Sequence, residues 1–122
     1  MPRALEIAVI DDDESFREAL VESLCSLGYR ADGFASAEDY MRVPGGRSFD
    51  CIVTDIHMPG MSGLDLMKRL ATGGVTVPVV LITARSDKNL TTKAAAAGAA
   101  CLLRKPFEIR SLIDCIEGAV QD

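Results

Sequence analysis

The chain has 122 residues, of which 48% are hydrophobic, which is enough for one folded domain over residues 1–122 and excludes a disordered chain. Its net charge of −5, from 18 acidic and 13 basic residues, offers no basic surface for direct binding to nucleic acid. No apolar run approaches the roughly 20 residues of a membrane span, and Glu6 interrupts any signal-peptide core, so we expect a cytoplasmic protein without a membrane segment.

From the N-terminus onward, apolar runs typical of strands alternate with apolar residues at helical spacing. The predicted elements, in chain order, are a strand at 5–10, a helix at 14–27, a strand at 29–34, a helix that starts at 36 and ends before 44, a strand at 50–54, a helix over 64–70, a strand at 77–83, a helix at 86–97, a strand at 99–104 and a helix at 108–120. Asp13 can cap the first helix, although Ser15 and Glu18 offer a competing capping box.

This alternation favours parallel strands that are joined by right-handed helical crossovers, with helices on both faces of the sheet. We therefore expect an α/β fold with a doubly wound, five-stranded parallel sheet in the flavodoxin-like order 2-1-3-4-5. The more polar run at 29–34 is expected at an edge of this sheet.

The four cysteines lie far apart in the sequence and show neither a CxxC pair nor a nearby histidine. This spacing suggests neither a zinc site nor a redox dithiol. All four lie within apolar patterns, so we expect small, buried and reduced thiols at positions 25, 51, 101 and 115.

Polar side chains stand at the ends of four predicted strands. Asp11 and Asp12 follow the first strand, Asp55 follows the third, and Thr83 and Lys105 end the fourth and fifth. Because parallel strands end at one edge of a sheet, we expect these five side chains to share a cleft. The alternative, a solvated cluster at a helix start, does not explain why two acids end a buried strand. Three acids, a hydroxyl and an ammonium indicate a site for a hard cation and a phosphoryl group.

Four segments carry a family resemblance: residues 9–13, 54–63, 78–84 and 104–107, which read VIDDD, TDIHMPGMSG, PVVLITA and RKPF. The order and the spacing of these segments resemble those of the receiver domain of two-component response regulators, over the whole length of the chain. Within that family, the chain resembles the receivers of FixJ-like transcriptional regulators. The resemblance implies a phosphorylation-dependent signalling domain that catalyses only its own phosphotransfer and autodephosphorylation. A sensor histidine kinase or phosphotransfer protein would supply the phosphoryl group, and an output partner or a transcriptional effector domain would respond.

The resemblance assigns the phosphoacceptor role to Asp55 and the binding of Mg²⁺ or Mn²⁺ to Asp11, Asp12 and Asp55. The backbone carbonyl of His57 would be a further metal ligand, while its side chain would point out over the cleft. A carboxylate and a dianionic phosphoryl group repel each other, and a bound divalent cation removes this obstacle.

The remaining roles concern the phosphoryl group. The resemblance implies that Lys105 binds it and pairs with Asp55 in its absence, that Thr83 donates a hydrogen bond to it, and that Ala84 leaves room beside it. A cis peptide bond between Lys105 and Pro106 is also implied. For Thr83, the ordinary alternative is a buried strand threonine that is bonded to the backbone.

Two features are specific to this chain. His57 and Arg85 occupy the positions that tune the lifetime of the acyl phosphate in the family, although the sign of their effect does not follow from the sequence. Leu102 replaces the Tyr or Phe that family members usually carry three residues before the conserved lysine, and that swings inward on phosphorylation; leucine can still change rotamer, but it presents less area and no hydroxyl. The Ala-rich segment 93–100 fits either a helix that shifts easily or close packing by small residues.

Two other functions share features with this sequence. The alternative within the family is a degenerate receiver that acts as a constitutive interaction module, and the five intact site residues count against it. A phosphatase with an aspartyl nucleophile would carry that nucleophile on the first strand in an Asp-x-Asp pattern, whereas here Asp11 and Asp12 are adjacent and the expected acceptor, Asp55, lies on the third strand. We expect phosphorylation to favour a homodimer through the face formed by the fourth helix, the fifth strand and the fifth helix. The chain would be either a single-domain regulator or a fragment of a longer one.

Overall fold

The computed structural model of the protein describes residues 4–43, 48–85 and 87–120. Its strands are β1 (Glu6–Ile10), β2 (Arg30–Phe34), β3 (Cys51–Asp55), β4 (Val79–Thr83) and β5 (Cys101–Arg104). Its helices are α1 (Glu14–Ser26), α2 (Ala37–Met41), α3 (Gly63–Thr72), α4 (Lys88–Ala97) and α5 (Ile109–Val120). The elements alternate as the sequence predicts, with ends that differ by a residue or two; position 86, the predicted start of the fourth helix, lies outside the described residues.

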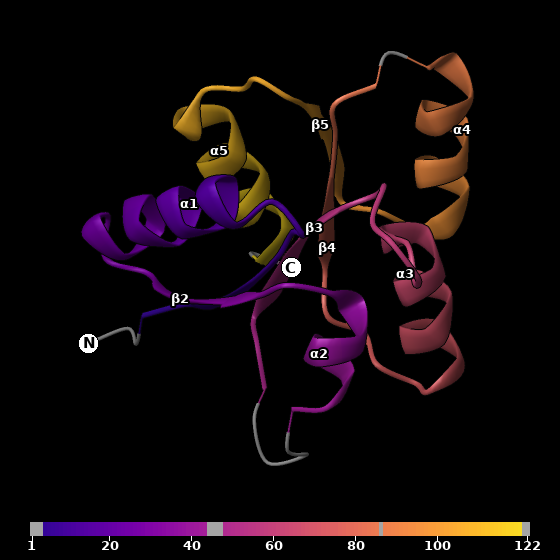
Figure 1. Ribbon diagram of the computed structural model, residues 1–122, viewed down its shortest axis with the longest axis horizontal. Coiled ribbons are helices and arrows are strands. Elements are labelled where there is room, and N and C mark those ends of the chain that lie inside the picture. Colours follow the sequence, from indigo (N-terminus) through magenta and orange to yellow (C-terminus); the bar gives the residue numbers. More distant parts are fainter. Residues whose placement is uncertain (1–3, 44–47, 86, 121–122) are drawn as a thin grey trace.

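The five strands form one parallel sheet in the order β2-β1-β3-β4-β5, which confirms the predicted topology. The polar strand β2 lies at one edge and β5 at the other (Figure 1). The chain leaves β1 in one direction to form β2 and returns on the other side to form β3. Such a reversal of strand order opens a crevice at the carboxyl ends of the two central strands, here β1 and β3.

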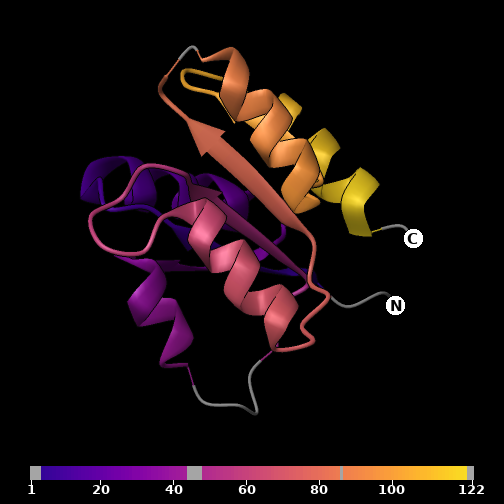
Figure 2. The ribbon, with the colours of Figure 1, turned by 90° about the vertical axis from the view of Figure 1, so that its right-hand side faces the viewer.

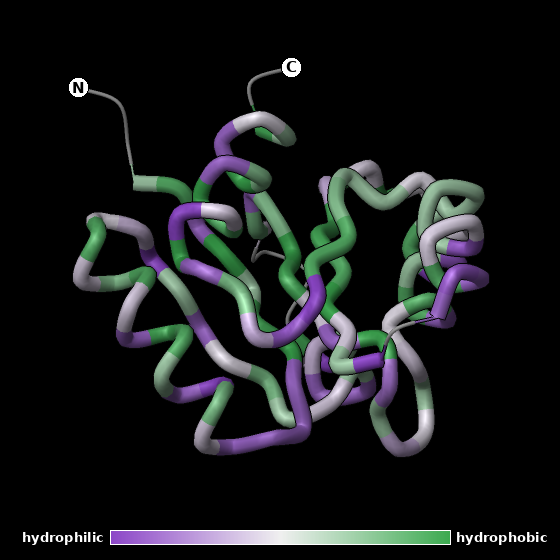
Figure 3. Tube along the Cα trace, turned by 90° about the horizontal axis from the view of Figure 1, so that it is seen from above, coloured by the Kyte–Doolittle hydropathy of each residue, from purple (hydrophilic) through white to green (hydrophobic). Residues whose placement is uncertain are grey.

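Two hydrophobic clusters cover the two faces of the sheet because the strand side chains alternate. Ile7 and Val9 of β1 face α1 and α5, where Leu24 and Ile116 are fully buried. Ala8 and Ile10 face the other cluster, which α2, α3 and α4 cover. Figure 2 shows α3 and α4 side by side on this second face, and in Figure 3 the hydrophobic colour follows the central strands. Within the described residues, no helix combines the length and the apolar character that a membrane crossing requires.

Local capping explains where the first and third helices begin. The side chain of Asp13 accepts a hydrogen bond from the backbone N–H of Phe16, so Asp13 rather than the Ser15–Glu18 pair caps α1. Ser62 and Asp65 form a reciprocal capping box at the start of α3. These caps fix the two helices that begin beside the ends of β1 and β3.

The cysteines depart from the prediction of four buried thiols. Cys101 on β5 and Cys115 on α5 are paired in a disulfide, Cys25 is exposed, and Cys51 remains a buried thiol. The pairing arises because α5 folds back over β5 and brings together two residues that are 14 positions apart. Sequence spacing carries no sign of this contact, so the prediction was wrong for three of the positions.

Candidate functional site

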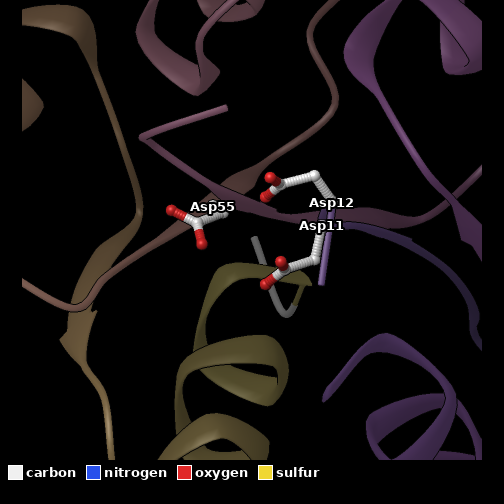
Figure 4. A group of neighbouring side chains, drawn as sticks. All are labelled: Asp11, Asp12 and Asp55. Carbon is white, nitrogen blue, oxygen red and sulfur yellow. The ribbon is translucent and has the colours of Figure 1, made fainter. Parts of the chain in front are cut away.

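The three acids meet at the crevice between β1 and β3. Asp11 and Asp12 directly follow β1, Asp55 is the last residue of β3, and the pairing of Ile10 with Thr54 aligns the two strand ends. One carboxylate oxygen from each acid lies within 4.8 Å of the others, and Figure 4 shows the carboxylates of Asp11 and Asp12 directed toward Asp55. Asp11 and Asp55 are buried, with 1% and 7% of their surface exposed, whereas Asp12 is open to solvent.

Lys105 joins two of these acids from the end of β5. Its Nζ donates to Oδ2 of Asp11 at 2.9 Å and to Oδ2 of Asp55 at 3.0 Å. Its pairing with Asp55 agrees with the expectation from the sequence, whereas the second bond to Asp11 was not expected. The peptide bond between Lys105 and Pro106 is cis, as the resemblance implies.

The charges of this cluster are strongly coupled. Burial raises the pKa of Asp11 above its ordinary value, and the hydrogen bonds from the Asp13 backbone and from Lys105 only partly oppose that effect. Burial would lower the pKa of Lys105, but its hydrogen bonds to Asp11 and Asp55 outweigh burial and raise this pKa. The site therefore holds one ammonium against several carboxylates, and the burial of Asp11 still disfavours its ionised form.

The donor set fits a hard divalent cation. Mg²⁺ prefers oxygen ligands and retains several waters, so two or three carboxylates that open to solvent on one side suffice. Asp12 supplies the solvent-facing carboxylate, and the buried Asp11 and Asp55 supply the others. A cation there would also offset the unfavourable burial of charge at Asp11.

The hydrogen bonds of Asp55 hold its carboxylate in a fixed orientation. Its Oδ1 accepts from the backbone N–H of His57 at 2.9 Å, and its Oδ2 accepts from Lys105. The backbone of Asp55 is constrained as well, because the helix-start residue Gly63 packs directly against its carbonyl oxygen. The carboxylate thus faces the crevice with both oxygens engaged.

Thr83 lies at the end of β4 and is 97% buried. Its Oγ1 accepts a hydrogen bond from the backbone N–H of Arg85 at 3.0 Å, which is the backbone-bonded arrangement considered as an alternative. This bond occupies a lone pair and leaves the hydroxyl hydrogen available to another acceptor. Ala84 and Arg85 follow, both exposed, and a cavity of about 260 Å³ is lined by residues that include Thr83, Arg85 and Leu102.

The His57 side chain is partly buried, and its Nε2 is enclosed without a hydrogen-bond partner among the residues that the structure describes. The ring is therefore partly enclosed by the protein, while its backbone N–H contacts Asp55.

The sequence interpretation missed two contributors from the first turn of α1. The Phe16 ring centroid lies 4.0 Å from Nζ of Lys105, and Phe16 also packs edge-on against Phe107. Arg17 donates from its guanidinium to the backbone carbonyl of Asp11 at 2.7 Å. In the sequence, the only signal is that both residues lie in the first turn of the helix that follows the acids, and this position does not identify their partners.

Comparisons with known proteins agree with the geometry. The family described as response regulator receiver domain matches residues 7–117. The transcriptional regulatory protein FixJ of Azorhizobium caulinodans is 37% identical over 120 residues, which cover 98% of this chain and 57% of the relative. The DNA-binding transcriptional regulator NtrC of Escherichia coli is 33% identical over 112 residues, which cover 92% of this chain and 24% of the relative. A crystal structure of FixJ-N superimposes with a TM-score of 0.90 and 30% identity over 99% of this chain and 96% of that one. The chain thus spans about half the length of the FixJ relative.

Proposed function

The chain belongs to the response regulator receiver domain family, and from that premise we propose that it accepts a phosphoryl group on Asp55. The donor is a sensor histidine kinase or a phosphotransfer protein of a two-component system. Modification of Asp55 then changes the conformation of the domain, which in turn controls an output partner or a transcriptional effector domain. The single receiver domain extends over residues 1–122.

The observation that carries this proposal is the position of Asp55. Its carboxylate lies within 4.8 Å of those of Asp11 and Asp12, and it accepts a hydrogen bond from the Lys105 ammonium, which also bonds Asp11. An oxygen of Asp55 attacks the phosphorus, and the bond from phosphorus to the donor's nitrogen or oxygen breaks as the acyl phosphate forms. The hydrogen bond from the His57 backbone orients the carboxylate for this attack.

Asp11, Asp12 and Asp55 would hold Mg²⁺ or Mn²⁺, with the His57 carbonyl as a further ligand. When bound, this cation screens the repulsion between the carboxylate and the phosphoryl oxygens. Lys105 already contacts Asp55, so its flexible ammonium can move onto a phosphoryl oxygen without a change of strand position. The exposed Asp12 leaves room for the solvent ligands of the cation.

Thr83 and Leu102 form the switch. The free hydroxyl hydrogen of Thr83 would turn toward the phosphoryl group, and Leu102, which lines the same cavity, would adjust its rotamer. Ala84 leaves space beside the phosphoryl group. His57 and Arg85 flank the approach of water and thereby set the rate of autodephosphorylation.

Incubation with acetyl phosphate and Mg²⁺, followed by intact mass spectrometry, tests the assignment. We expect the wild-type chain to gain the mass of one phosphoryl group, and we expect no gain for Asp55→Asn or for wild type in EDTA. The acyl phosphate is labile to base, so the adduct should disappear after brief alkaline treatment.

Asp114→Asn is the matched control, because it makes the same change of charge at an exposed position on α5. This control should be labelled like wild type. A full phosphoryl mass shift in Asp55→Asn would contradict the assignment of the acceptor. A wild-type chain that folds, binds Mg²⁺ and is never labelled would instead indicate a constitutive interaction module.

A further inference from the structure

The disulfide partners Cys101 and Cys115 join two elements outside the acidic site. Cys101 is the first residue of β5, Cys115 lies in the middle of α5, and their Cα atoms are 6.1 Å apart. This separation lies within the range that disulfides require without movement of the backbone. Both residues are partly exposed, so a small reagent can reach them.

The other two cysteines are unsuited to the same chemistry. Cys51 is fully buried, and burial raises the pKa of its thiol to about 12, which leaves almost no thiolate at neutral pH. Cys25 is exposed on α1, where its Sγ lies 3.9 Å from the backbone carbonyl of Ala31 and is not paired with another cysteine. A cross-link between Cys101 and Cys115 is thus favoured by geometry over any other pairing.

We propose that Cys101 and Cys115 form a reversible redox site that ties α5 to β5. Oxidation proceeds by thiol–disulfide exchange with a small-molecule disulfide. A thiolate of the pair attacks one sulfur of the reagent, and one small thiol leaves. The second cysteine then attacks the mixed disulfide, which releases the second small thiol and closes the protein disulfide. Excess dithiol reverses the sequence.

The segment enclosed by this cross-link contains a residue of the acidic site. Lys105 lies between Cys101 and Cys115, and so does Phe107, which packs against Phe16 under the Lys105 ammonium. A cross-link restricts the separate opening of α5 from β5, because it lowers the entropy gained when the two elements part. The redox state of the pair therefore controls the mobility of the segment that carries Lys105. The relevance of this redox control to signalling rests on the proposed function. The redox chemistry of the cysteine pair does not depend on that function.

Thiol counting tests the redox site directly. The full chain is equilibrated with glutathione disulfide or with dithiothreitol, quenched with acid and alkylated in denaturant. Its mass is then measured by intact mass spectrometry. After oxidation we expect Cys101 and Cys115 to escape alkylation without carrying glutathione, while Cys51 is alkylated and the exposed Cys25 is alkylated or carries glutathione. After reduction, all four cysteines should be alkylated. Cys25→Ser should keep the cross-link. Cys115→Ser should instead carry glutathione on Cys101, as the mixed disulfide of the first step. Alkylation of all four cysteines in the oxidised sample, or a cross-link that includes Cys25, would overturn the proposal.

Hydrogen exchange tests the restraint. Backbone amides of α5 should exchange several-fold more slowly in the oxidised chain than in the reduced chain, while those of α3 should not change. Cys115→Ser should show no redox dependence in either helix. Equal exchange of α5 in both redox states would show that the bond does not restrain the segment. Neither measurement involves a phosphodonor, so failure here is distinct from failure of labelling at Asp55.

Discussion

At the scale of single residues, the electrostatics of Asp11 dominate the site. The carboxylate is buried, and its raised pKa means that the folded chain binds this proton more tightly than the unfolded chain does. Ionisation of Asp11 therefore costs stability. The cost develops as pH rises from the ordinary value of 3.8 through the raised pKa of the folded state, and it persists at neutral pH. The ammonium of Lys105 offsets it only in part.

Asp11→Asn should therefore stabilise the metal-free chain at pH 7, by about 1 kcal/mol or roughly 4 °C in Tm. The same change should shrink the rise in Tm that millimolar Mg²⁺ gives the wild type, since binding to the folded state stabilises by mass action. Thermal unfolding in EDTA and in Mg²⁺ measures both effects. Asp114→Asn serves as the control for charge and should keep the response to Mg²⁺. If Asp11→Asn lowers the Tm in EDTA and keeps the full Mg²⁺ response, the electrostatic account of the site is wrong.

At the scale of elements, the junction of β3 with α3 places the acceptor. Gly63 begins α3, and its backbone N–H donates to the carbonyl of Ile56 at 3.0 Å. A Cβ atom at position 63 would come within 2.5 Å of the Asp55 carbonyl oxygen. Only a residue without a side chain allows α3 to start this close to the strand that carries Asp55.

Gly63→Ala should force α3 away from β3 and destabilise the fold by roughly 1–3 kcal/mol, as overpacking does. Because the clash is with Asp55 itself, labelling by acetyl phosphate should also slow. Gly118→Ala is the matched control: a Cβ there meets nothing within 4 Å, so this helical position should gain about 0.5–1 kcal/mol. Urea unfolding and the labelling rate are the measurements. A Gly63→Ala chain as stable as wild type would show that the junction is not tightly packed.

At the scale of the whole molecule, the site lies at one end of the sheet and the proposed output surface lies at its β5 edge. α4 and α5 flank β5 on opposite faces of the sheet. One cavity is lined by Thr83 of β4, by Leu102 of β5 and by residues of α4 that include Thr91. A change at Thr83 can therefore reach α4 and β5 through side chains that line the same cavity.

Beryllofluoride, a mimic of the acyl phosphate, should convert a monomer into a weak, concentration-dependent dimer through this surface. Coupling of such sites is typically about 1–3 kcal/mol, and we expect the low end because Leu102 presents less area than an aromatic residue. Sedimentation velocity over a range of concentrations measures the shift. Thr91→Arg, an exposed change on α4 beside the cavity, should weaken the dimer, whereas Ser23→Arg on α1 should not. Identical monomer profiles with and without beryllofluoride at high concentration would mean that this receiver signals in another way.

The fold and the convergence of the acids and Lys105 at one edge of the sheet can be predicted from the sequence. The alternation of apolar runs and helical spacing predicts the sheet order, because parallel strands with right-handed crossovers leave few arrangements. The position of Asp11, Asp55 and Lys105 at strand ends predicts their convergence, because those ends share one edge. Residues at the ends of parallel strands can therefore be located from their spacing along the sequence, because the sheet fixes where each strand ends.

The contacts that cross between elements follow from tertiary packing and cannot be predicted from spacing along the chain. The Lys105 ammonium is shared between Asp11 and Asp55 above the Phe16 ring, Nε2 of His57 is enclosed, and Cys115 meets Cys101. Each of these contacts depends on the rotation and depth at which a helix or a loop packs on the sheet. Local spacing shows which face of an element is buried, but it does not say which side chain of another element lies opposite.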